Sequence, residues 1–65
     1  MGTIESLKRI LEIESNWELS YRICAIAGEK DPCWIRQVFH AIETGSVPQI
    51  AEHALMIIKS RLGSH

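Results

Sequence analysis

The sequence predicts an all-α fold, a compact bundle of four short helices at residues 3–15, 17–28, 32–44 and 47–62. Apolar residues recur at spacings of three and four, which is the period of an amphipathic helix and not of a half-buried strand. Glycine, proline and capping residues divide this pattern, and the short loops between the segments place neighbouring helices antiparallel or at a steep angle. A chain of 65 residues suffices for a single domain, residues 1–65.

The first helix is predicted over residues 3–15. Thr3 is a suitable N-cap, and the carboxylate of Glu5 interacts favourably with the helix dipole in the first turn. The apolar residues at helical spacing are Ile4, Leu7, Ile10, Leu11 and Ile13. The boundary at Ser15-Asn16 is the weakest one, so a single bent helix across it is the alternative.

The second helix is predicted over residues 17–28, with Asn16 as its N-cap. Its apolar stripe consists of Leu19, Ile23 and Ile26. Gly28 is a natural helix stop, because glycine tolerates the left-handed conformation just beyond a helix C-terminus.

The third helix is predicted over residues 32–44, and Asp31-Pro32 is the strongest single signal in the chain. Aspartate is a favoured N-cap, and proline fits the first helical position, where no N–H donor is needed. The broad apolar face that follows consists of Trp34, Ile35, Val38, Phe39 and Ile42. Gly45 is expected to end this helix.

The fourth helix is predicted over residues 47–62. Ser46 and Gln49 have the spacing of a capping box, in which the serine hydroxyl accepts a hydrogen bond from the glutamine N–H. Residues 54–58 are apolar nearly all round, which is typical of a helix that is buried on more than one side. In so small a protein this places the helix in the middle of the bundle or at a dimer interface.

The chain carries more apolar side chain than a domain of its size readily buries. It is 46% hydrophobic and 23% charged, whereas a domain this small buries only about 60% of the surface that its unfolded chain exposes. We therefore expect a second apolar surface that another chain covers, either a second copy in a homodimer or a different protein. A very well filled monomeric core is the alternative, and the same helices also allow an intertwined dimer.

The residues expected at this interface are apolar side chains of the last helix together with a tryptophan anchor. They are Trp17, Trp34, Leu55, Met56, Ile58 and Leu62. The sequence thus predicts a small protein–protein interaction or oligomerisation module that acts as an adaptor, inhibitor or regulatory subunit.

No catalytic, cofactor or metal site is predicted, and we expect the chain not to be an enzyme. It contains neither a Gly-rich phosphate loop nor a nucleophile elbow. Cys24 and Cys33 lack the close spacing of zinc-binding cysteines, and His40 and His53 complete no ligand motif. Cys24 is expected to be a small buried residue. Cys33 is a candidate reactive thiol, because the positive end of a helix dipole favours the thiolate.

Charge and hydropathy favour a cytoplasmic protein. The net charge of −1 creates no field that attracts nucleic acids or membranes. There is no run of about 18 apolar residues to span a membrane, and no basic start followed by an apolar run as in a secretory signal. Two cysteines without such a signal suit a reducing compartment. The ends, residues 1–3 and 63–65, have the composition of cloning remnants.

Residues 42–63, IETGSVPQIAEHALMIIKSRLG, resemble the end of lambda-repressor-type helix-turn-helix domains. In that family a recognition helix ends in Ile-Glu-x-Gly, a proline follows, and an apolar helix ends in Leu-Gly. The resemblance implies a dimeric DNA-binding regulator whose third helix enters the major groove and presents Arg36, Gln37 and His40 to base edges. Because the cations of the chain are scattered and acidic residues surround this helix, protein binding is the favoured function and DNA binding the alternative.

Overall fold

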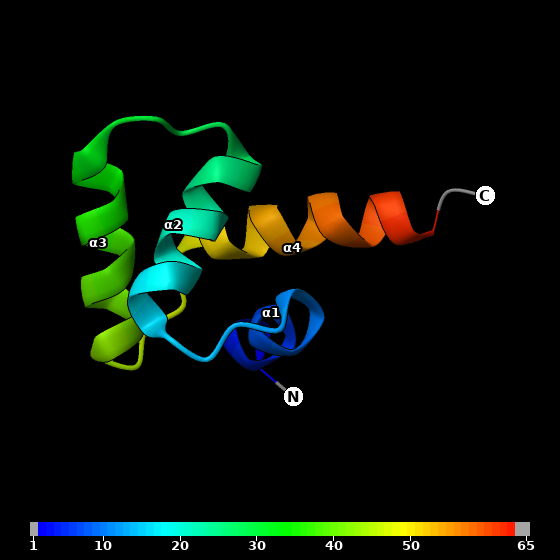
Figure 1. The fold of residues 1–65 in the computed structure, drawn as a ribbon, viewed down its shortest axis with the longest axis horizontal. Coiled ribbons are helices and arrows are strands. Elements are labelled where there is room, and N and C mark those ends of the chain that lie inside the picture. Colours follow the sequence, from blue (N-terminus) through cyan, green and yellow to red (C-terminus); the bar gives the residue numbers. More distant parts are fainter. Residues whose placement is uncertain (1, 64–65) are drawn as a thin grey trace.

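Four α-helices make up the fold of residues 2–63, the part of the chain that the computed structural model describes. They are α1 (Thr3–Leu11), α2 (Asn16–Ala27), α3 (Pro32–Glu43) and α4 (Gln49–Leu62) (Figure 1). The predicted all-α fold of four short helices is therefore confirmed. Residues 1, 64 and 65, which belong to the suspected cloning remnants, lie outside the described residues.

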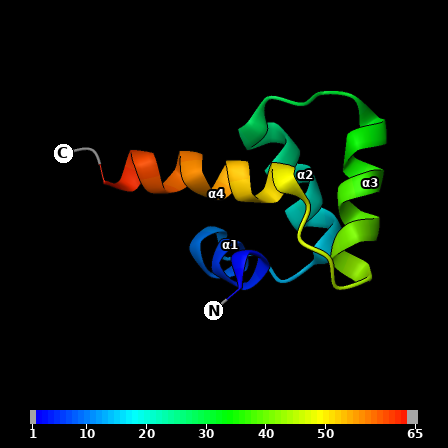
Figure 2. The same cartoon turned by 180° about the vertical axis from the view of Figure 1, so that it is seen from behind.

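The helices α2 and α3 lie side by side and run in opposite directions, as a helical hairpin (Figures 1 and 2). The helix α4 crosses the hairpin and packs against α2. The helix α1 packs against α4. The C-terminal turns of α4 extend past the other helices, as both views show. This extension accounts for the long dimension of the molecule, which measures 35 × 25 × 18 Å.

The helices α1, α2 and α3 end in the same C-terminal motif. The residue just beyond each helix or its C-cap adopts the left-handed conformation, with φ of 57° at Glu12, 84° at Gly28 and 85° at Gly45. The next N–H donates to the carbonyl five residues earlier, from Ile13 to Lys8, Glu29 to Cys24 and Ser46 to Ala41 (3.0, 2.8 and 2.8 Å). These are the bonds of the Schellman motif. The helix stops predicted at Gly28 and Gly45 are confirmed.

The prediction that the first helix continues to Ser15 was wrong, because α1 ends at Leu11. The left-handed Glu12 reverses the chain, so Ile13 leaves the helix and still enters the core, where it is buried in the same cluster as Leu7. A Schellman motif commonly includes such an apolar contact back to the last turn. Ile13 therefore fits the apolar period without being helical, and the single bent helix is also excluded.

Two helix starts also differ from the prediction by one residue. Ser15, not Asn16, is the N-cap of α2, and its Oγ accepts a hydrogen bond from the N–H of Glu18 (3.3 Å). Thr3 is the first residue of α1, and Gly2 precedes it without a side-chain cap. The start of α3 is confirmed, since Asp31 Oδ1 accepts from the N–H of Cys33 (2.9 Å).

The predicted capping box at the start of α4 does not form. The helix begins at Gln49, and Pro48 occupies the N-cap position with no side-chain hydrogen bond. Ser46 already contributes its N–H to the end of α3, and the chain is extended at Pro48 (φ −69°, ψ 150°). The N-cap position therefore lies two residues beyond Ser46, whose N–H is already bonded to the end of α3 and does not take part in a capping box.

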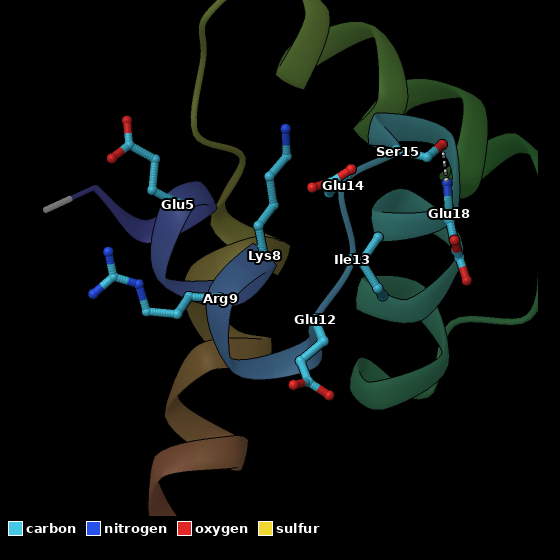
Figure 3. A pocket seen from close by; sticks show the side chains of 8 residues that line it. All are labelled: Glu5, Lys8, Arg9, Glu12, Ile13, Glu14, Ser15 and Glu18. Carbon is cyan, nitrogen blue, oxygen red and sulfur yellow. Dashed lines mark hydrogen bonds between the residues drawn. The ribbon is translucent and has the colours of Figure 1, made fainter.

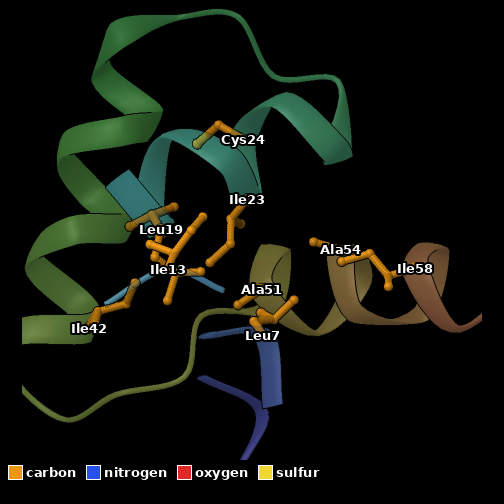
Figure 4. Packing of buried hydrophobic residues seen from close by; sticks show 10 residues of the cluster. Leu7, Ile13, Leu19, Ile23, Cys24, Ile42, Ala51, Ala54 and Ile58 are labelled. Atoms are coloured by element: carbon orange, nitrogen blue, oxygen red, sulfur yellow. The ribbon is translucent and has the colours of Figure 1, made fainter. Parts of the chain in front are cut away.

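The hydrophobic core lies where α2 meets the other three helices (Figure 4). Its buried residues are Leu7, Ile13, Leu19, Ile23, Cys24, Val38, Ile42, Ala51, Ala54 and Ile58. On α4 the most completely buried residues are the small Ala51 and Ala54, which allow this helix to approach its neighbours closely. The polar Ser20 is also buried, and its hydroxyl donates to the carbonyl of Asn16 (2.8 Å).

Candidate protein-binding surface

A groove of about 660 Å³ separates α3 from the first half of α4 and reaches the end of α2. Trp34 lines it from α3 and is 41% exposed, whereas the neighbouring Val38 is buried. Ile50 and His53 line it from α4. The groove therefore has a lining of mixed polarity with a partly exposed tryptophan, the kind of side chain that anchors protein interfaces.

A second, shallower hollow of about 330 Å³ continues along α4. His53 lines both depressions, and Met56 and Ile57 lie in the hollow. Met56 is 70% exposed, the largest value among the exposed large hydrophobic residues of the described chain. We define the α4 surface as Ile50, His53, Met56 and Ile57; it continues across the groove to Trp34, and His53 is its one polar member.

The helical period explains why the α4 surface faces outward. Ala51, Ala54 and Ile58 follow each other at spacings of three and four, and they are the buried residues of α4. Residues on the opposite side of the same turns, such as Met56, then point to solvent. The fold therefore buries one side of α4, packs Ile50 and Leu55 partly against the core, and leaves Met56 exposed.

The residues predicted for an interface on α4 divide into three groups. Met56 and Leu62 are exposed, and Leu62, which is 61% exposed, is the last residue of α4. Leu55 is half-buried and packs against the core. The structure corrects the assignment of Ile58: it lies four residues after Ala54, on the inward side, and is buried in the core of its own chain.

The two tryptophans do not belong to one surface. Trp34 lines the groove, whereas Trp17 packs edge-to-face on Phe39 with 5.2 Å between ring centroids and 74° between planes. Half of Trp17 remains exposed. Trp17 lines neither the groove nor the hollow. Trp34 is therefore the tryptophan that lies beside the α4 surface.

The residues proposed for DNA reading lie on the exposed side of α3. Arg36, Gln37 and His40 are all exposed, and Gln37 also lines the groove. Acidic residues stand at both ends of the helix: Asp31 caps its start, and the carboxylate of Glu43 accepts a hydrogen bond from Asn16 Nδ2 at its end. The helix α3 contains one arginine and no lysine to contact phosphates. DNA binding stays a prediction.

A charged notch of about 910 Å³ lies between α1 and the start of α2 (Figure 3). Its lining consists of Glu5, Lys8, Arg9, Glu12, Ile13, Glu14, Ser15 and Glu18. In Figure 3 the charged side chains spread outward and do not converge on a common point. Within residues 2–63, no three His, Cys, Asp or Glu side chains come together as metal ligands.

The two cysteines lie in different environments. Cys24 is buried on α2, and burial, with a smaller contribution from the charge of Glu29, raises the pKa of its thiol. Cys33 is exposed in the first turn of α3. The expected burial of Cys24 is confirmed, and the reactivity of Cys33 stays a prediction.

The sequence analysis did not assign Ile50, His53 and Ile57 to the interface, although their spacing of three and four was a usable signal.

Comparison of the chain with protein-family models, curated proteins and solved structures finds no match. Among the helices of residues 2–63, none combines the length and the apolar character that a membrane crossing requires.

Proposed function

We propose that this chain is a helical protein-interaction module that works as a homodimer, with the α4 surface as its contact. The observation that carries the proposal is the apolar side chain left outside the core on and beside α4, above all Met56, which is 70% exposed. A single exposed methionine is ordinary, but here it continues into Ile57, Ile50 and the groove beside Trp34. Exposed apolar side chains that are grouped together with polar residues around them are typical of interaction sites.

The size of the surface supports a dimer that uses both α4 and the groove. A stable dimer buries about 800 Å² on each copy, or about one sixth of the 4578 Å² that this chain exposes. One side chain such as Met56 cannot supply that area. We therefore expect the contact to extend along α4 and to include the wall of the groove at Trp34.

Sedimentation velocity over about 1–100 µM protein, the range of Kd expected for a modest interface, tests the proposal. The wild-type chain should pass from monomer to dimer, and Met56→Glu should stay monomeric because it places a charge within the contact. Tyr21→Glu is the matched control, since Tyr21 is 57% exposed but lines neither the groove nor the hollow. A wild-type chain that stays monomeric throughout would overturn the proposal.

DNA binding is the second candidate, favoured by the common exposed face of Arg36, Gln37 and His40. Fluorescence polarisation with random-sequence duplex at about 50 mM salt tests it, because binding through phosphate contacts is strongest at low salt. Arg36→Ala should weaken binding. No binding under these conditions excludes this function.

A further inference from the structure

We infer that two copies pair through antiparallel α4 helices on a two-fold axis at Met56, and that reciprocal Glu52–Lys59 ion pairs fix their orientation. The inference rests on the proposed homodimer and deepens it, since it names the residues that set the geometry of the contact. It follows from the order of side chains around the exposed side of α4.

The outermost stripe of α4 has the spacing of a helix–helix seam. Gln49, His53, Met56 and Ser60 follow one another at spacings of four, three and four, and all four are exposed. Such a stripe keeps one line of contact along a neighbouring helix. It also lies directly opposite the buried alanines of α4, so a second helix can approach without disturbing the core.

The two flanks of this stripe differ in chemistry. Ile50 and Ile57 lie on the flank beside the groove and the hollow. Glu52 and Lys59 lie on the other flank, where both are exposed. One flank therefore offers apolar contact, and the other offers one negative and one positive charge, two helical turns apart.

An antiparallel two-fold pairing brings each flank against the same flank of the second copy. With Met56 on the axis, a residue before Met56 faces a residue equally far beyond it. Glu52 precedes Met56 by four residues and Lys59 follows it by three, so the two residues lie within about 1.5 Å of exact register, the rise of one residue. The symmetry makes this pair twice.

The apolar flank is satisfied by the same arrangement. Ile57 lies next to the axis and therefore packs beside Ile57 of the second copy. The basic end of α4, with Arg61, passes along the groove of the other chain, whose lining includes the carboxylate of Glu29. A parallel two-fold pairing would instead set the Glu52–Lys59 flank of each copy against the Ile50–Ile57 flank of the other, so the charge pattern favours the antiparallel form.

Charge exchange provides the test. Glu52→Lys and Lys59→Glu, each alone, convert two attractive pairs per dimer into two repulsive ones, and each should raise the dimer Kd about tenfold or more. The double variant, and an equimolar mixture of the two single variants, should return to the wild-type Kd. Lys30→Glu reverses a charge in the exposed α2–α3 loop and is the matched control. Circular dichroism checks that each variant stays helical.

The outcomes separate the inference from the proposed function. A wild-type chain that never dimerises overturns both. A wild-type dimer whose Kd is unchanged by either single variant overturns the antiparallel pairing and leaves the homodimer standing, because in a parallel dimer Glu52 and Lys59 face the apolar flank of the second copy and form no ion pair with each other.

Disulfide trapping in a Cys33→Ser background gives a second readout. Met56→Cys should cross-link, since the two positions face each other on the axis. Ser60→Cys should not, because the two copies of residue 60 lie about 12 Å apart along the helices, beyond the roughly 7 Å limit of a disulfide between Cα atoms. Efficient cross-linking at residue 60 would contradict the antiparallel pairing.

Discussion

Glu12 holds a backbone conformation that suits glycine, and replacing it should stabilise the protein. Its φ of 57° and ψ of 45° lie in the left-handed region, which costs an L-residue about 1–2 kcal/mol. Glycine avoids that cost but loses more freedom on folding, about 0.5–1 kcal/mol. Glu12→Gly should therefore raise the free energy of unfolding by about 0.5–1 kcal/mol, the balance of these two effects.

The other two Schellman motifs supply the reverse experiment. A Cβ added at Gly28 or Gly45 would meet no atom within 4 Å, so the cost of alanine there is conformational and not steric. Gly28→Ala and Gly45→Ala should each lower the free energy of unfolding by about 1 kcal/mol. At the same position of the motif, the free energy of unfolding should therefore rise when Glu12 becomes glycine and fall when either glycine becomes alanine.

Urea unfolding followed by circular dichroism, at one fixed protein concentration, measures these differences. A change of 1 kcal/mol corresponds to about 4–8 °C in Tm for a domain of this size. Glu12→Ala is the control that removes the carboxylate and retains the Cβ, so it should leave stability close to wild type. If Glu12→Gly proves no more stable than Glu12→Ala, backbone strain at residue 12 is not what limits the stability of α1.

Three further predictions concern the cap of α2, the core and the buried thiol. Ser15→Ala should cost about 1 kcal/mol in urea unfolding through loss of the N-cap bond to α2; an unchanged midpoint would contradict the cap. Leu19→Ala, at a fully buried position, should cost about 2–5 kcal/mol and leave much of the chain unfolded by circular dichroism, whereas a cooperative transition at the wild-type midpoint would refute its central role. Because burial raises the pKa of Cys24, the unfolded thiol ionises first above about pH 8.5 and stability should fall as the pH rises further. Urea titrations at pH 7 and pH 10 should show a larger loss for wild type than for Cys24→Ala; equal losses would rule out this linkage.

The sequence predicted helix ends well where one residue type dominates the conformation. Gly28, Gly45 and Asp31-Pro32 each specify a boundary through their own backbone or side chain, and the structure places boundaries there. Glu12 gave no such signal, because a left-handed glutamate is stabilised by its neighbours. The next residue, Ile13, is apolar and fits the helical period, so the pattern suggests that the helix continues past Glu12.

The candidate surface was predictable only in part for a related reason. A helix that is apolar nearly all round conceals which side faces its own core, so Ile58 and Met56 look equivalent in the sequence. The small Ala51 and Ala54 distinguish the two sides, since close packing against α2 requires small side chains. The groove beside Trp34 depends on how α4 crosses the hairpin, and periodicity within single helices contains no information about that crossing.

The part of α4 that extends past its neighbours has a consequence for local order. Helical turns without packing partners open readily, so the amide protons of residues 59–62 should exchange with solvent far faster than those around Ala54 in a dilute sample. In the antiparallel pair those same turns lie against the first half of the second α4. Hydrogen exchange at the tail of this helix should then slow as the protein is concentrated, and the two copies would each complete the last turns of the other.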